Sequence, residues 1–222
     1  MTLTKRLVNN AAAPRRRPGR PVEDGSRDRL RAAAQAEFAK RGFAGASVDK
    51  IAAAARVNKA MIYYHFSSKA ALYREILRDM FQAVGRRARA VAESNEPPAD
   101  KIGLFIEAIA AEADARPHFP PIWLREVAEG GTHLDATVLR DITGVVQSLA
   151  AIIDEGVRRG RFTRVNPVLI HVSIVGPLMI HFGSRGLRER LERHGLRGAG
   201  TTPPALIEHL RRVALGLLEG RT

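Results

Sequence analysis

The sequence predicts an all-α protein, with a small three-helix head near the N-terminus and a larger helical body behind it. Apolar residues recur at spacings of three and four through most of the chain, which is the period of a buried helix face. Ser and Asn caps and Gly and Pro breaks separate these segments. The chain has 222 residues with 45% hydrophobic content, enough for one larger or two small domains with a real core.

The first predicted helix covers residues 27–41. Leu30, Ala34 and Phe38 lie four apart and form its buried stripe. Gly42 follows, at the position where helices favour a left-handed residue.

A second short helix is predicted to begin at Ser47. The Ser47 hydroxyl can accept a free backbone N–H of the first turn. Val48, Ile51 and Ala52 then share one apolar face. The pattern breaks at residues 55–57, so we expect a tight turn there.

A third helix is predicted after a second cap, Asn58. Ile62 and Phe66 lie four apart and must face the core. On a helical wheel, the residues pointing outward are then Ala60, Met61, Tyr63 and Tyr64, with Lys59 and His65 at the margins. A protein has little reason to expose paired tyrosines unless a partner docks there, although tyrosines also serve as ordinary packing residues.

A helix, a tight turn and a helix with a polar aromatic outer face can place a recognition helix in the DNA major groove. Lys69 follows Ser67 and Ser68, where the next helix should begin. Its cation and the free N–H groups of that helix are expected to form an anion site.

The run from Ser47 to Lys69 resembles the DNA-binding segment of the TetR family of bacterial transcriptional regulators. The Tyr63–Phe66 run with Lys69 three residues later is its most specific part. The resemblance implies a set of DNA-contacting positions, namely Ser47, Asn58, Lys59, Ala60, Met61, Tyr63, Tyr64, His65 and Lys69. The family's inter-helix turn usually carries Gly where this chain has Arg56, so a positive φ there would be strained.

The positive charge is concentrated near the N-terminus. Residues 1–69 hold fifteen Lys and Arg and five Asp and Glu, or +10 of the total +13. A polyanionic partner is therefore expected for this part of the chain. Residues 1–26 form a predicted basic arm, whose cations are Arg15, Arg16, Arg17 and Arg20. The arm is either a solvated tail or, as we favour, a segment that enters the minor groove beside the head.

The rest of the chain reads as consecutive helices. The first runs from Ser68 to about Glu93 and links head to body. The others are expected at 99–115, from 122 to Gly130, at 134–159, at 167–183 and at 205–219, with a Gly-, Thr- and Pro-rich loop at 194–204. This divides the chain into an arm (1–26), a helix-turn-helix domain (27–70) and an effector-binding and dimerisation domain (71–222).

The last two helices are richly apolar for their length and are expected to pair across a two-fold axis as a four-helix bundle. The predicted seam on the last helix consists of Leu206, Leu210, Val213 and Leu217. The resemblance implies the same homodimer, which presents two recognition helices to half-sites one DNA turn apart.

An apolar effector site is predicted in the body, lined by Phe105, Ile109, Phe119, Trp123 and Met179. A single Trp, two Phe and a soft Met suit a lipophilic small molecule, although each residue could equally be plain core. The histidines are expected to be satisfied structural residues. We find no motif for an enzyme, a cofactor or a metal, and no Cys.

Together these observations predict a cytoplasmic, dimeric, ligand-responsive repressor that binds a pseudo-palindromic operator. The alternative is an architectural protein that binds DNA regardless of sequence. We expect no membrane partner, because the start of the chain lacks an apolar signal core and the longest apolar run, residues 168–182, is too short to span a bilayer.

Overall fold

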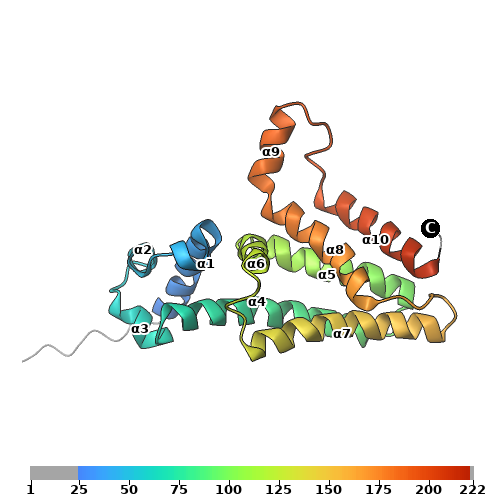
Figure 1. The fold of residues 1–222 in the computed structure, drawn as a ribbon, viewed down its shortest axis with the longest axis horizontal. Helices are drawn as coiled ribbons and strands as arrows, with labels where there is room; N and C mark the ends of the chain where they lie inside the picture. Colours follow the sequence, from blue (N-terminus) through green and yellow to red (C-terminus); the bar gives the residue numbers. More distant parts are fainter. Residues whose placement is uncertain (1–24, 221–222) are drawn as a thin grey trace, which may run out of the picture.

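The computed structural model describes residues 25–220, which form ten α-helices and no strands (Figure 1). The helices are α1 (Ser26–Gly45), α2 (Val48–Ala54), α3 (Ala60–Phe66), α4 (Lys69–Ala92), α5 (Pro98–Ala115), α6 (Phe119–Ala128), α7 (Ala136–Arg158), α8 (Pro167–Gly183), α9 (Arg185–Arg193) and α10 (Pro203–Glu219). The all-α prediction is confirmed. The predicted arm lies outside the described residues up to residue 24, including Arg15, Arg16, Arg17 and Arg20, and its last predicted residue, Ser26, instead begins α1.

The head consists of α1, α2 and α3, and both predicted caps form. Ser47 accepts the N–H of Lys50, and the Asn58 side chain accepts the N–H of Ala60 at 2.8 Å. The predicted stripe of α1 and the inward residues of α3, Ile62 and Phe66, are buried together. The head therefore has a core of its own, which fixes the outer face of α3.

The turn between α2 and α3 contains the backbone strain that the sequence predicted. Arg56 adopts φ 55°, in the left-handed region, and its N–H donates to the carbonyl of Ala53. A side chain in this region is crowded against the following carbonyl oxygen. The turn keeps its geometry because Ala55 is buried on one side of it and the Asn58 cap follows on the other.

Replacing Arg56 by Gly should raise the free energy of unfolding by about 1 kcal/mol, because glycine adopts positive φ without the Cβ clash. Urea unfolding measures this. The control Ala53→Gly lies at an exposed helical position of α2 and should lower the same quantity by about 1 kcal/mol. Equal losses in the two variants would contradict a strained turn.

Helix α4 is the long helix that joins the head to the body. It begins within the head, and α7 runs beside it along most of the body (Figure 1). Its buried residues, which include Leu72, Ile76 and Met80, belong to one cluster that continues from the head into the body. The two parts therefore share a continuous core along α4.

The body differs from the prediction in two places. Helix α9 occupies part of a segment for which no helix was predicted; it has no buried residue and extends away from the body (Figure 1). On α7 the sequence spacing predicts an inward face of Leu139, Ile142, Val146, Leu149 and Ile153, but the buried residues include Val138, Val145, Leu149 and Ile152, and Leu139 is 49% exposed. The spacing of the buried residues was predicted correctly, but near the start of α7 the wrong side of the helix was predicted to face the core.

By length and composition, α7 is the one described helix that could cross a bilayer; α8 and α9, bent by 70°, pass the same test only as a single broken span. The sequence had singled out residues 168–182 instead. Core helices of soluble proteins pass this test too, and α7 packs along α4, α5 and α8.

Candidate DNA-binding face and effector cavity

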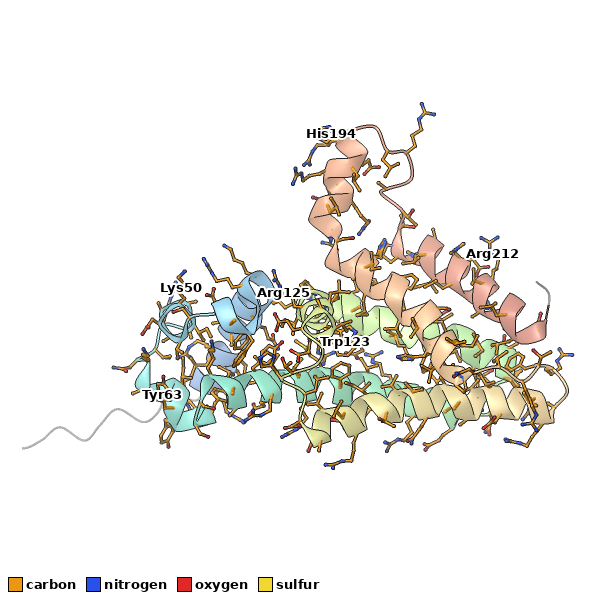
Figure 2. All side chains as sticks on the ribbon, viewed as in Figure 1. Lys50, Tyr63, Trp123, Arg125, His194 and Arg212 are labelled. Atoms are coloured by element: carbon orange, nitrogen blue, oxygen red, sulfur yellow. The ribbon has the colours of Figure 1, made fainter. Side chains whose placement is uncertain are left out.

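The outer face of α3 is exposed at the end of the molecule farthest from α10 (Figure 2). The Tyr63 side chain is 48% exposed and that of Tyr64 69% exposed, and Ala60 is also exposed. Met61 is half-buried and packs against the core. The tyrosines therefore project outward, as the third-helix pattern predicted, and their role as DNA contacts stays a prediction.

Two positions assigned to DNA contact are occupied within the protein. The His65 ring is half-buried, and its Nε2 lies 2.8 Å from the Ser26 hydroxyl at the start of α1. The Lys69 ammonium donates to the carbonyl oxygens of Phe43 at 2.9 Å and Ala46 at 3.1 Å, and lies 4.5 Å from the centre of the Phe43 ring. The free anion site that we expected at Lys69 is thus a clamp between α4 and the end of α1.

Replacing Lys69 by Met should therefore lower the free energy of unfolding by roughly 1–3 kcal/mol, because two carbonyls lose a charged donor while the stem is kept. Chemical unfolding measures the loss. In the control Lys59→Met, an exposed ammonium that pairs with Asp49 at 2.9 Å is removed, and the free energy of unfolding should stay nearly unchanged because solvent screens this pair. If Lys69→Met leaves the free energy of unfolding unchanged, the Lys69 hydrogen bonds do not stabilise the fold.

Basic residues near the tyrosines extend the candidate face. Lys59 stands at the start of α3, and its hydrogen bond to Asp49 raises the pKa of the ammonium, so it is charged at neutral pH. Ser47 lies half-exposed at the start of α2. Lys50, which the sequence analysis did not select, is exposed on α2 at the same end of the molecule as Tyr63 (Figure 2). On the helical wheel Lys50 lies opposite the centre of the apolar face formed by Val48, Ile51 and Ala52, so its exposure was readable from the helical period.

The body contains an apolar cavity of about 40 Å³ between α4, α5, α6, α7 and α8. Four of the five predicted effector residues line it: Ile109, Phe119, Trp123 and Met179. Phe105 does not; it is fully buried in the core instead. A cavity of this size holds a few water molecules and no drug-sized ligand.

The sequence analysis missed His171, which also lines the cavity. Burial lowers the pKa of its imidazole, and its Nδ1 is buried without a hydrogen-bond partner among the described residues. Our expectation of a satisfied structural histidine is therefore wrong at this position. The signal was the spacing of His171, Val175 and Met179, which lie four apart and share the cavity-facing side of α8.

Helix α6 connects this cavity to the head. Trp123 lines the cavity, and three residues later Glu126, which is fully buried, accepts a hydrogen bond from the Tyr73 hydroxyl of α4 at 2.9 Å. Glu126 also accepts the backbone N–H of His133 at 2.8 Å. The centre of the His133 ring lies 4.2 Å from the centre of the Phe43 ring, near the end of α1. Burial and the bond to Glu126 raise the pKa of Tyr73, which keeps its hydroxyl protonated.

The same junction contains a group of possible metal ligands, Glu126, Glu129 and His133, with ligand atoms within 4.8 Å of one another. The sequence had given no metal site. The Glu126 oxygens already accept bonds from Tyr73 and His133, so the group is explained as a hydrogen-bond network.

The outer faces of α8 and α10 carry apolar side chains without a partner in the described chain. The most exposed on α8 are Val168, Leu169, Val172 and Ile180, at 52–65%. They lie on one side of the helix, opposite the buried Ile170, Ile174 and Leu178.

The predicted seam of α10 needs one correction. Leu210 is only 4% exposed and packs inside its own protomer with Ala214 and Leu218. Val213 is exposed at 39%, and Leu206 and Leu217 are half-buried at the edge of the same face. Leu210 is therefore not available to a partner, whereas the other three residues are.

Comparison with known proteins agrees with this geometry. Residues 30–76 match the family model described as bacterial regulatory proteins, tetR family. The transcriptional repressor NicS of Pseudomonas putida is 28% identical over 63% of this chain and 66% of its own length. The repressor SCO4008 of Streptomyces coelicolor is 44% identical over 24% of this chain and 28% of its own. This chain thus matches less than two thirds of the length of these relatives.

Among solved structures, a bacterial regulatory protein of the tetR family from Rhodococcus RHA1 superposes with a TM-score of 0.72, covering 88% of this chain and 98% of that one at 16% identity. That likeness concerns the fold of head and body together.

The described chain thus combines a three-helix head that has the helix-turn-helix arrangement and an exposed outer helix with a helical body that contains an apolar cavity. The head of the chain matches the TetR family of bacterial regulatory proteins, and head and body together share the fold of a solved structure of that family.

Proposed function

We propose that the protein is a homodimeric transcriptional repressor that binds a pseudo-palindromic DNA operator and is released by a small lipophilic effector. The single observation that carries the proposal is the pair of exposed tyrosines on the outer face of α3, within the segment that matches the family model. NicS and SCO4008 are named as transcriptional repressors, whereas the relative FasR of Mycolicibacterium smegmatis is named as an activator; repressors are the more frequent among these names, which supports repression as the direction of control.

In the proposed complex, α3 enters the major groove with Ala60, Tyr63 and Tyr64 toward the bases and phosphates. Ser47 and Lys50 of α2 and Lys59 approach the backbone. The arm before residue 25 is basic in sequence and is proposed to add minor-groove or phosphate contacts. His65 and Lys69 act indirectly, since their bonds to Ser26, Phe43 and Ala46 hold α3 and α4 against α1.

The dimer is proposed to form through the outer faces of α8 and α10. These two helices pack against each other, and their exposed Val168, Leu169, Val172 and Val213 form an apolar surface that a second copy would cover. Pairing two such helices gives a four-helix bundle and presents two recognition helices on one side.

Coupling is proposed to pass through α6. An effector that enlarges the cavity must displace Trp123, and Glu126 moves with it because both lie on the same short helix. Glu126 holds Tyr73 of α4 and His133, which contacts Phe43 of the head. The effector shifts the equilibrium toward the state with Trp123 displaced only by the difference between its affinities for the two states.

The test is a selection of bound fragments from the genome of origin, followed by competition with random duplex DNA. A regulator should prefer its selected site by roughly a thousandfold or more. A preference near unity, with tight binding retained, would leave the architectural alternative in place of this function.

A further inference from the structure

The effector cavity contains one polar side chain in an apolar lining. Aromatic and aliphatic residues supply the rest of its wall, with Phe81, Phe119 and Trp123 on one side and Val145, Val175 and Met179 on others. Among these lining residues, only His171 of α8 has a side chain with a nitrogen that can accept a strong hydrogen bond, because the indole N–H of Trp123 can only donate and the thioether of Met179 is a weak acceptor.

The Nδ1 atom of His171 is buried, and no group of the described chain bonds to it. A buried polar atom without a partner is destabilising, and a ligand or a water that supplies the partner removes that cost. Because His171 shares its face of α8 with Val175 and Met179, this partner would come from the cavity side.

The surroundings exclude a charged partner for this atom. Burial lowers the pKa of His171, so the imidazole is neutral at physiological pH. No Lys, Arg, Asp or Glu lines the cavity, and a carboxylate placed there would lose its hydration without gaining a cation. A hydroxyl group avoids this cost and suits either imidazole tautomer, because it both donates and accepts.

We propose that the cavity binds neutral lipophilic molecules that carry a hydroxyl group, and that His171 hydrogen-bonds that hydroxyl. This inference rests on the proposed function, in which the cavity is the effector site. The inference adds the chemical class of the ligand and the residue that selects this ligand.

Trp123 provides the readout. It is the only Trp in the chain and it lines the cavity. Its ring packs edge-to-face against that of Phe81, with 4.9 Å between the ring centres. A ligand in this space lies beside the Trp123 ring and changes its surroundings, so binding should change the intrinsic fluorescence.

The experiment titrates the full chain with octanol, octane and octanoate and follows Trp123 emission. Octanol should bind roughly tenfold more tightly than octane or octanoate. His171→Leu should remove this preference by weakening octanol roughly tenfold, while His171→Asn, which keeps a polar atom near the position of Nδ1, should retain most of it. The control His209→Leu changes an exposed histidine of α10 and should leave all three affinities unaltered.

Equal affinities for octanol and octane in the native protein, or an unchanged octanol affinity in a folded His171→Leu variant, would overturn the role of His171 and leave the regulator intact. If no probe changes Trp123 emission, this cavity is not the effector site and the inference fails with it. Operator binding, measured on the same samples, shows separately whether the proposed DNA-binding function stands.

Discussion

Operator affinity should fall by roughly a hundredfold when Tyr63 and Tyr64 are both replaced by Ala, with no loss of stability. The two side chains are 48% and 69% exposed, so their removal leaves no cavity in the head. Each lost contact to a base edge or a phosphate should weaken binding by about 1–2 kcal/mol. Fluorescence anisotropy with the selected operator measures the affinity, and thermal unfolding measures the stability.

Replacing both Tyr63 and Tyr64 by Phe separates the contribution of the aromatic ring from that of the hydroxyl. It keeps the aromatic surface and removes only the hydroxyls, so an affinity between those of the native protein and the double Ala variant shows that both ring and hydroxyl contribute. An unchanged operator affinity in the double Ala variant would rule out α3 as the recognition helix.

A matched pair of charge variants tests the orientation of the head. Lys50 and Arg212 are both exposed cations, and they lie at opposite ends of the molecule (Figure 2). Lys50→Ala should lower the slope of log affinity against log salt by about 1, as expected for the loss of one phosphate contact, and Arg212→Ala should not change it.

The second large effect concerns the proposed dimer. Replacing Leu169 and Val172 by Glu should give a folded monomer, because these side chains are 65% and 59% exposed in the protomer and two pairs of charges would meet across the two-fold axis. Operator affinity should fall by roughly a hundredfold or more, since each half-site must then be bound independently. Analytical ultracentrifugation gives the mass, and anisotropy gives the affinity.

The control for this variant is Leu187→Glu on α9. Leu187 is 56% exposed, comparable to Val172, but it lies on the helix that extends away from the body, outside the proposed interface. It should leave the dimer intact. A persistent dimer in the Leu169 and Val172 variant would refute the α8 face as the interface. Leu210→Glu, by contrast, should unfold the protomer, because Leu210 is 4% exposed.

The head was the part of the molecule most accessible to sequence reasoning. Its helices are short, their caps are local, and Ser47 and Asn58 act on N–H groups two or three residues away. The strain at Arg56 was predictable for the same reason, because φ at a tight turn depends on neighbouring residues. The outward placement of Tyr63 and Tyr64 followed from Ile62 and Phe66, which had to be buried.

The errors occurred where a residue's environment is supplied by distant segments. Lys69 looked like a free cation until α1 brought the carbonyls of Phe43 and Ala46, more than 20 residues away, against it. Leu210 fitted an outer seam on its own helix, but it is buried within the protomer, where α10 packs against α5 and α8. Helical spacing fixes which residues share a face and leaves open which neighbour that face meets.

By itself, then, the sequence determined the all-α architecture, the caps and turn of the reading head, and the identity of the outward tyrosines, because each depends on bonds between residues close in the chain. Only the tertiary structure decided which apolar residues enclose the cavity, that His171 has an unpaired nitrogen there, and that Glu126 of α6 joins Tyr73 to His133. These features depend on segments brought together from α4 to α8, and their packing is set by shape and burial across the whole core.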